Sequence, residues 1–498
     1  MMSDRSTAVM KSWIRGAVLG MPFAGALGML CGCAVGPDFS RPEPPRAAGY
    51  GPSAIQLGAA GPADVQQHLL PGERVVGQWW ELFHSRELND TLALAIAGSP
   101  TLDSARATLA QARQAVIVAA GALYPQADAG AGATRERVST EVPSSPGHAV
   151  ENLFSVGPMV SFSPDIFGGV RRKVEQQGAL AEVQRYELAA AYLSLTGNAV
   201  TQAIDIASAR EQINAVTDII AVDQRNLDLV RIEQEAGKAA MTDVLSAQSQ
   251  LAVDRALLPP LSQQLSAAGD ALTQLVGRTP AEWTPPAFDL SALSLPTELP
   301  VSLPSILVHE RPDILAGEAQ LHAASAAIGV ATAQLYPNVT LTASWTQAAA
   351  STGTLFQNSN SLWGVGAALT APLFHGGALT AQRREAVDAF AAQLAVYRQT
   401  VLQAFGQVAD ILQALDHDAA ALDAQRQALD TAQESLGLSQ ESYKEGQSSF
   451  IQVLQAQRLF AQARLGYAQA RSQRYLDTAQ LFEAMGGAWQ DWKDPAMR

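Results

Sequence analysis

The feature that most constrains this chain is an internal repeat. Leu123-Tyr124-Pro125 returns as Leu335-Tyr336-Pro337, 212 residues later, and both follow an alanine-rich run. "GKAAMTDVLSAQ", at 237–248, returns as "GQSSFIQVLQAQ", at 446–457, with an offset of 209. A repeat of this length fixes how many times one structural unit occurs. The sequence therefore predicts a fold built from two copies of the same structural unit.

Further matches keep the same order and nearly the same offset. They are Ser99-Pro100-Thr101-Leu102 with Arg311-Pro312-Asp313-Ile314, Val156-Gly157 with Val365-Gly366, and "SPDIFGG" (163–169) with "APLFHGG" (371–377). Each half is therefore predicted to have the same order of elements. A helix ends at Leu-Tyr-Pro, two strands joined by a loop follow, and a proline and a Gly-Gly pair lead into a long helix, which a glycine separates from a last helix.

The helical parts are too long for a compact domain. From Gly377 to Glu445 the chain offers about 69 residues without proline, roughly 100 Å of helix at 1.5 Å per residue. Such a rod belongs in an extended coiled-coil assembly. Gly237 and Gly446 stand at matched positions and predict turns between helices. If these glycines were instead tolerated within a helix, the rods would be longer still.

Each half also predicts two strands. After Pro337 the apolar residues Val339, Leu341, Ala343 and Trp345 alternate with Thr340, Thr342, Ser344 and Thr346. This period of two predicts a strand with one apolar and one hydroxyl-rich face. We expect strands at about 126–138, 152–163, 337–349 and 361–372. Their lengths are near those of tilted membrane strands, although soluble hairpins would give a similar pattern.

The first 32 residues have the composition of a signal peptide. A basic segment precedes Gly16–Met29, an apolar run that is too short to span a bilayer. The only cysteines are Cys31 and Cys33. A disulfide between them would close a very small, strained loop. The spacing resembles a bacterial lipobox instead, with Gly32 before Cys33, and predicts lipidation of Cys33. Ala34 in the following position predicts sorting to the outer membrane.

Composition and repeat together divide the chain into six segments. They are a lipoprotein signal peptide (1–32), a lipid-anchored connector with an equatorial segment (33–98), a first repeat (99–279), a Pro-rich connector (280–304), a second repeat (305–485) and a tail (486–498). The Pro- and Gly-rich stretches at 34–78 and 280–304 predict extended connectors along a surface.

Several classes of function are disfavoured. The net charge of −14 argues against a nucleic-acid partner, which requires a basic face. The seven histidines show no metal-ligand spacing, and neither a G-x-S-x-G motif nor a phosphate loop is present. His375, beside a Gly-Gly pair, favours a turn over a ligand. We predict no enzyme activity, no metal and no cofactor other than the lipid on Cys33.

Four strands cannot close a barrel, and an open sheet edge in hydrocarbon leaves backbone groups unpaired. The chain must therefore combine its strands with those of other copies. A dimer would give a narrow eight-stranded barrel filled by side chains, whereas a trimer would give twelve strands and a lumen.

The chain resembles the TolC-like outer-membrane factors, in particular the NodT-type lipoprotein branch that serves resistance-nodulation-division efflux pumps. The resemblance covers nearly the whole mature chain. Its motifs are "CAVGPDFSRP" (33–42), "WWELFHSREL" (79–88) and "ERPDILAGEAQLHAASAAIGVATAQLYPNVTLTAS" (310–344).

This resemblance implies an α+β membrane protein that forms a homotrimer in the outer membrane. It implies a twelve-stranded β-barrel with four strands per chain, continued by a long periplasmic α-helical barrel. It also implies partners: a periplasmic adaptor at the tips around Gly237 and Gly446, and an inner-membrane resistance-nodulation-division transporter. The implied function is a passive exit duct. The alternative is a lipid-anchored periplasmic coiled-coil scaffold or adaptor without a channel.

The resemblance also implies a gate at the helix tips. Thr242, Asp243 and Tyr443 match gate positions of the family, and an Asp243–Tyr443 hydrogen bond would link neighbouring hairpins. Gln452 and Gln455 stand where aspartates often ring the constriction, which argues against a strongly anionic, cation-binding ring. Alternatively, all five are solvated residues of the helix tips.

Overall fold

The computed structural model of the chain describes residues 34–44, 47, 49–51, 57, 65–142 and 145–497, without the side chains of 138–149. The predicted signal peptide and Cys33 lie outside the described residues. The chain forms two compact units. The first unit contains 34–37, 120–173 and 328–383, and the second contains the remaining described residues from Asp38 onward.

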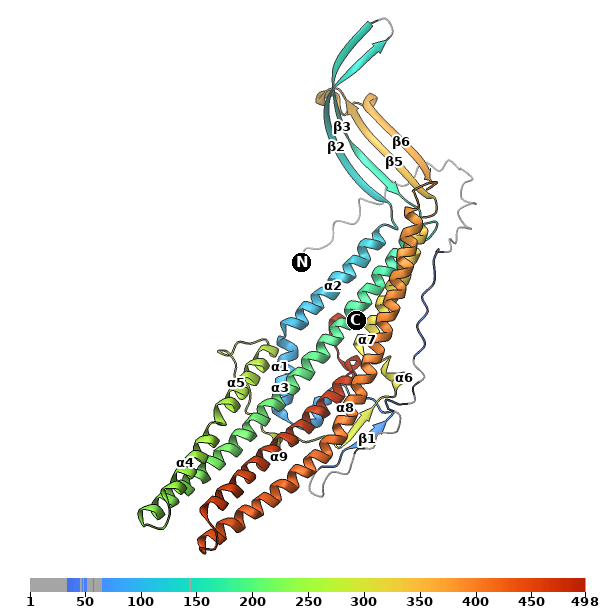
Figure 1. Cartoon of the computed structure of the whole chain (residues 1–498). Helices are drawn as coiled ribbons and strands as arrows, with labels where there is room; N and C mark the ends of the chain where they lie inside the picture. Colours follow the sequence, from blue (N-terminus) through green and yellow to red (C-terminus); the bar gives the residue numbers. More distant parts are fainter. Residues whose placement is uncertain are drawn as a thin grey trace, which may run out of the picture. The chain divides into compact units, whose positions relative to one another are not determined.

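The repeat predicted from sequence is present in the order of the elements (Figure 1). The first half runs α2 (Pro100–Gly121), β2 (Gln126–Val142), β3 (Ser145–Phe162), α3 (Gly169–Glu235), α4 (Met241–Arg255) and α5 (Leu258–Leu275). The second runs α7 (Pro312–Ala333), β5 (Asn338–Ala349), β6 (Ser361–Thr370), α8 (Ala378–Lys444) and α9 (Phe450–Ala484). The helices α3 and α8 have 67 residues each, which confirms the long rods.

Both Leu-Tyr-Pro motifs end a helix in the same way. The backbone N–H of Leu123 donates to Ala120 and that of Leu335 donates to Thr332, at 3.0 and 3.1 Å. The following tyrosine N–H makes the next bond of the same kind in each half. Proline then supplies no N–H and fixes φ, so the helix stops and a strand begins.

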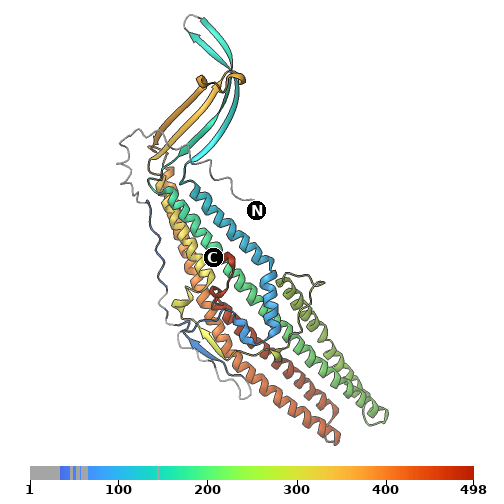
Figure 2. The ribbon, with the colours of Figure 1, turned by 180° about the vertical axis from the view of Figure 1, so that it is seen from behind.

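The first unit is built on one antiparallel sheet in the order β2-β3-β5-β6 (Figures 1 and 2). The second hairpin agrees with its predicted strands to within two residues. The first hairpin is longer than predicted, because 126–138 and 152–163 extend to Gln126–Val142 and Ser145–Phe162. Phe154 pairs with Ala349 at the end of β5. From Leu153 back to Ser145, β3 pairs with β2 alone. Cross-strand pairing carries this ribbon onward although its sequence alternates weakly.

The second unit packs its helices around an aromatic and aliphatic core. The 3-10 helix η2 (Trp79–Phe83) buries Trp79, Trp80 and Phe83, and α1 (Arg86–Gly98) buries Leu88 and Leu92. The Trp79 ring lies 5.5 Å from that of Phe482 in α9. The helical segments of this unit also include α6 (Pro304–Leu307). The remaining 3-10 turns are η3 (Leu290–Ala292), η4 (Thr352–Thr354), η5 (Asn358–Asn360), η6 (Trp489–Asp491) and η7 (Pro495–Met497), of which η4 and η5 belong to the first unit.

The prediction that both connectors run over a surface was wrong in part. Each contributes one strand to a two-stranded parallel sheet, in which β1 (His68–Pro71) pairs with β4 (Glu298–Val301). Leu290 and Leu299 are fully buried. The proline-rich composition of 280–304 therefore does not exclude burial, because several of its apolar residues enter the core.

Among the described residues one helix, α7, is long and apolar enough to cross a membrane. More than half of its most apolar window, 56%, is buried inside the protein. This burial is typical of a core helix.

Candidate functional site

The four-stranded sheet has one apolar and one small, polar face. Its register places apolar residues of β5 directly opposite apolar residues of β6: Val339 with Leu369, Leu341 with Ala367, Ala343 with Val365 and Trp345 with Trp363. The other face pairs Thr342 with Gly366 and Ser344 with Gly364. Directly opposite residues share a face, so the alternation predicted for each strand becomes a continuous apolar stripe.

Aromatic side chains mark both ends of this stripe. Trp345 and Trp363 pair at one end, and the rings of Tyr336 and Phe167 stack at 4.7 Å at the other. From Asn338, where β5 begins, to Trp345 the strand covers about 24 Å, or about 18 Å across a membrane at a tilt of about 40°. Trp363 and Val365 are 79% and 78% exposed in the single chain. These features match the apolar band and aromatic girdles of an outer-membrane barrel strand.

The two outer strands of the sheet, β2 and β6, each pair with only one neighbour. A sheet edge in hydrocarbon needs a partner strand, because nothing else satisfies its N–H and C=O groups. Placed in hydrocarbon, the sheet of one chain would therefore be incomplete.

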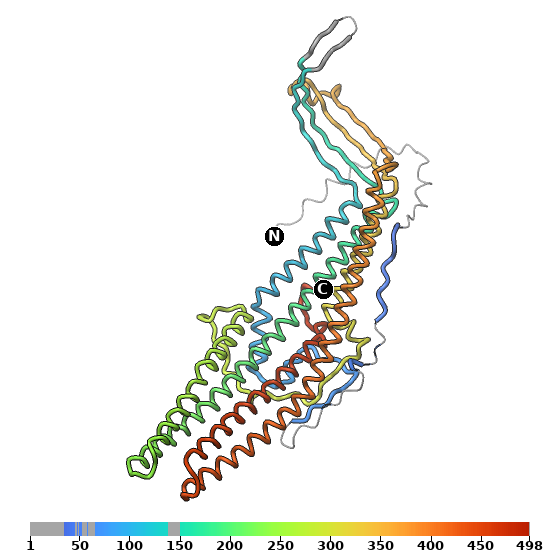
Figure 3. Tube along the Cα trace, in the orientation of Figure 1, coloured from blue at the N-terminus to red at the C-terminus, as the bar shows by residue number. Residues whose placement is uncertain are grey.

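The helix tips predicted at Gly237 and Gly446 are two copies of one turn (Figure 3). Gly237 has φ +74° and Gly446 has φ +73°. The N–H of the next residue, Lys238 or Gln447, donates to the carbonyl five residues earlier, at 2.7 and 2.8 Å. This is the Schellman arrangement, in which the left-handed position favours glycine.

Tyr443 connects the two tips within one chain. Its hydroxyl donates to Glu233 of α3, and its ring lies 5.5 Å from that of Phe450. Burial, followed by the hydrogen bond to Glu233, raises the pKa of Tyr443, so the hydroxyl keeps its proton. Sequence reasoning missed Glu233, which carries no pattern that distinguishes it from its acidic neighbours.

The other gate candidates are spread over the tip surface. The Asp243 carboxylate accepts from the N–H of Ala240, at 3.2 Å, and so caps α4. Thr242, Gln452 and Gln455 are exposed. The structure thus brings Tyr443 to Glu233. Within the described chain the predicted Asp243–Tyr443 hydrogen bond between neighbouring hairpins is not formed, because the Tyr443 hydroxyl donates to Glu233 and Asp243 caps α4.

A hydrophobic cluster lies directly behind the tips. It joins α3, α4 and α9 through Leu227, Val230, Val244, Ala247, Leu251, Phe450 and Val453. Next to it, Asp223 and Asp254 are 3% and 4% exposed. Sequence reasoning missed this carboxyl pair. The available signal was that both aspartates continue the apolar stripes of their helices, Val216-Ile219-Asp223-Leu227 and Val244-Ala247-Leu251-Asp254.

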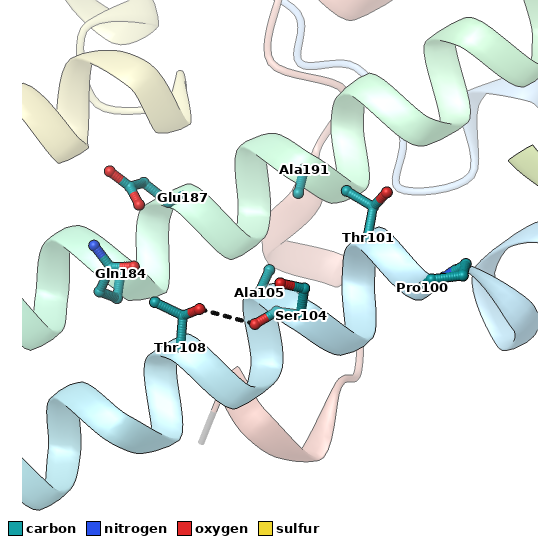
Figure 4. A pocket seen from close by; sticks show the side chains of 8 residues that line it. All are labelled: Pro100, Thr101, Ser104, Ala105, Thr108, Gln184, Glu187 and Ala191. Carbon is teal, nitrogen blue, oxygen red and sulfur yellow. Dashed lines mark hydrogen bonds between the residues drawn. The ribbon is translucent and has the colours of Figure 1, made fainter.

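A groove of about 530 Å³ separates α2 from α3 (Figure 4). Its lining is mostly small or uncharged: Pro100, Thr101, Ser104, Ala105, Thr108, Gln184, Glu187 and Ala191. The hydroxyl of Thr108 donates to the backbone carbonyl of Ser104, at 2.9 Å, so it serves the helix. The arrangement is that of a helix-packing surface.

Comparison with protein families decides the class. The model described as "Outer membrane efflux protein" matches residues 91–278 and 303–487, one match in each half of the chain. The chain belongs to the outer membrane efflux protein family. The two matched segments contain both strand hairpins and both glycine tips described above.

Curated relatives of this efflux protein are similar over nearly their whole length. The pyoverdine export outer membrane protein OpmQ of Pseudomonas aeruginosa is 31% identical over 455 residues, covering 89% of this chain and 94% of the relative. Nodulation protein T of Rhizobium leguminosarum is 28% identical over 469 residues, covering 93% and 92%.

Solved structures show the same fold. The outer-membrane channel OprN superposes with a TM-score of 0.83 at 25% identity, covering 92% of this chain and 100% of that chain. The Campylobacter jejuni CmeC outer membrane channel superposes with a TM-score of 0.82 at 19% identity, covering 93% and 96%. The protein is an outer-membrane efflux channel and not an enzyme, as predicted.

Proposed function

We propose that three copies of this efflux protein form a closed twelve-stranded barrel and act as the exit duct of a tripartite pump. The observation that carries the proposal is the four-stranded sheet with unpaired edges at β2 and β6. Strand directions alternate across the sheet, so β6 of one chain would pair antiparallel with β2 of the next. Repeating this contact closes the barrel without leaving an edge.

The small polar face supports three copies over two. An eight-stranded barrel has an interior that side chains just fill, whereas twelve strands enclose a lumen. Thr342, Ser344, Gly364 and Gly366 would line that lumen with little bulk and with groups that tolerate water. The mass of the detergent-solubilised full-length protein, measured by light scattering, tests the count. Three chains per particle are expected, and two would overturn the proposal.

We further propose that Cys33 carries the lipid that anchors the protein. The residues that follow it are held tightly. The N–H of Val35 donates to the carbonyl of Phe167 at 3.0 Å, and Arg172 Nε donates to the carbonyl of Val35 at 3.2 Å. Phe167 belongs to one aromatic end of the sheet, so this attachment would place the acyl chains at a membrane boundary. Mass spectrometry of the mature N-terminal peptide should find a diacylglycerol and an N-acyl group.

The helix tips are the proposed contact for the periplasmic adaptor and the proposed gate. A Tyr443→Phe variant lacks the hydroxyl that donates to Glu233, a charge-assisted bond worth about 1–3 kcal/mol. We expect it to raise the open probability of single channels in planar bilayers. Tyr467→Phe, which removes a hydroxyl farther along α9 that accepts from Arg426 at 2.8 Å, is the matched control. Equal open probability of Tyr443→Phe and wild type would remove Tyr443 from the gate.

The cargo is proposed to be small organic molecules delivered by an inner-membrane resistance-nodulation-division transporter. One relative is named for pyoverdine export and another for toluene efflux. A deletion strain should become sensitive to part of a panel of antibiotics, solvents and detergents. Wild-type protein should restore resistance fully, and Cys33→Ala protein at equal abundance should restore less.

A further inference from the structure

Asp223 of α3 and Asp254 of α4 face each other inside the helical unit. Their carboxyl groups are in hydrogen-bond contact, and both side chains are more than nine-tenths buried. Gln457 of α9 donates to Asp223, and Gln250 donates to Asp254 Oδ2 at 2.8 Å. Two buried carboxylates so close would repel strongly, so one must keep a proton and donate it to the other.

The surroundings supply no charge that would replace this proton. Asn226 completes the cluster by donating to Gln457 Oε1 at 2.6 Å. In the part of the chain that the structure describes, neither aspartate forms an ion pair, and the groups facing them from α4 and α9 are the amides of Gln250 and Gln457. Asp223 Oδ2 receives no N–H donor and is buried, which fits an oxygen that holds or accepts the shared proton.

The pair sits at the end of a short helix. The chain breaks at Ala256 and Leu257, after α4, because Pro259 and Pro260 open the next helix. The opposite end of α4 begins at Met241 and carries Thr242 and Asp243. A helix of 15 residues therefore has the carboxyl pair near its break and gate candidates at its tip.

We propose that Asp223 and Asp254 form a proton-binding clasp that holds α4 against α3 and α9, and that loss of the shared proton releases α4 with its tip. The clasp is independent of the proposed function, whereas its effect on channel opening rests on the proposed gate.

The direction of the pH dependence follows from the pair. Burial, followed by the hydrogen bond and the charge of Asp254, raises the pKa of Asp223 to about 8. When α4 is released, the pair reverts toward the ordinary aspartate pKa of about 4. The clasp is therefore fully closed below about pH 4 and is lost as pH rises through about 8. Between these two pH values, the equilibrium constant for release of α4 from α3 and α9 rises about tenfold for each pH unit.

Amide hydrogen exchange of the full-length assembled protein tests the clasp. Between about pH 5.5 and 7.5, protection of peptides from 241–255, corrected for intrinsic exchange, should fall about a hundredfold in wild type. The Asp223→Asn variant should lose this slope, because an amide N–H replaces the shared proton without ionising. The control Asp430→Asn, at an exposed aspartate of α8, should keep it.

Two results would overturn the clasp: a flat wild-type profile, or a slope that survives in Asp223→Asn. Asp254→Asn gives the same test if the first variant does not assemble. Single-channel recordings at both pH values separate the clasp from the gate. A pH-dependent α4 without a change in opening keeps the clasp and removes the gate at this tip. A pH-dependent change in channel opening that persists in Asp223→Asn shows that the clasp is not its cause.

Discussion

The two helical hairpins share their tips and differ in their return arms. Both turn at a glycine with nearly the same φ, yet α9 returns as 35 uninterrupted residues, whereas the first arm is divided into α4 and α5. Pro259 accounts for the break, and Ala468, buried in α9, occupies the matching position. The tip geometry is thus common to both repeats, whereas only the second repeat has a return arm that is one continuous helix.

The polar interior differs as well. The second hairpin has a comparable carboxyl pair, the half-buried Asp418 with the buried Asp477, and burial followed by that contact raises the pKa of Asp418. Here Arg474 lies nearby and lowers it, while donating to Gln67 Oε1 at 2.9 Å and to the carbonyl of Val65 at 2.8 Å. The second arm is therefore linked to the N-terminal connector through Arg474. The carboxyl pair of the first arm has no such cation beside it among the described residues.

The largest expected effect comes from removing that cation. Arg474→Ala leaves buried acceptors without a donor and two carboxyls without a counter-charge, at a cost of about 3–5 kcal/mol. Thermal unfolding of the assembled protein should shift to much lower temperature. Arg464 is on α9, as Arg474 is, and forms a more exposed ion pair with Asp218 of α3. Arg464→Ala breaks this pair and should cost under about 1 kcal/mol. Similar losses in both variants would contradict this account of the second arm.

A proline in the continuous return arm should have the next largest effect. Ala468→Pro gives α9 the residue that the first arm has at the matching position and should cost about 3 kcal/mol or more. Less protein should reach the outer membrane as an assembled, heat-resistant species on gels. Ala468→Ser is the control for a change of side chain without loss of the N–H. Normal assembly of the proline variant would mean that α9 tolerates a break as the first arm does.

Much of this architecture could be predicted, for reasons visible in particular residues. The strands after Pro337 alternate strictly, and the glycine tips interrupt proline-free helices. The extension of the first hairpin past Phe154 could not be predicted, because pairing between strands maintains it. The contact of Tyr443 with Glu233 and the pairing of β1 with β4 join residues more than 200 positions apart, and no local pattern encodes such contacts.

The shared tip geometry predicts equal sensitivity in the two repeats. Gly237→Ala and Gly446→Ala each force a side chain into the left-handed region, at about 1–2 kcal/mol. Gly437→Ala, within α8, should instead stabilise by up to about 1 kcal/mol. Chemical denaturation of the three variants gives the values. A loss confined to one tip would show that the matching turns are not equivalent in the assembled protein.

The smallest expected effect lies at the helix starts. Asp243 caps α4, and the matching Gln452 is the third residue of α9. Asp243→Asn should lose about 0.3–1 kcal/mol and Gln452→Glu should gain about as much, because a negative charge favours a helix N-terminus. Opposite shifts in unfolding temperature are expected. Shifts of the same sign would indicate that charges from neighbouring chains dominate at the tips.

The unpaired edges of β2 and β6 have a consequence for biogenesis. In the proposed trimer no chain can complete its membrane sheet alone, so insertion and assembly become one concentration-dependent event. A cell that makes an edge-defective chain beside the normal one would build mostly mixed particles, each with an open seam. Such an allele should behave as dominant-negative, and its severity should follow the ratio of the two chains rather than the absolute amount of the normal one.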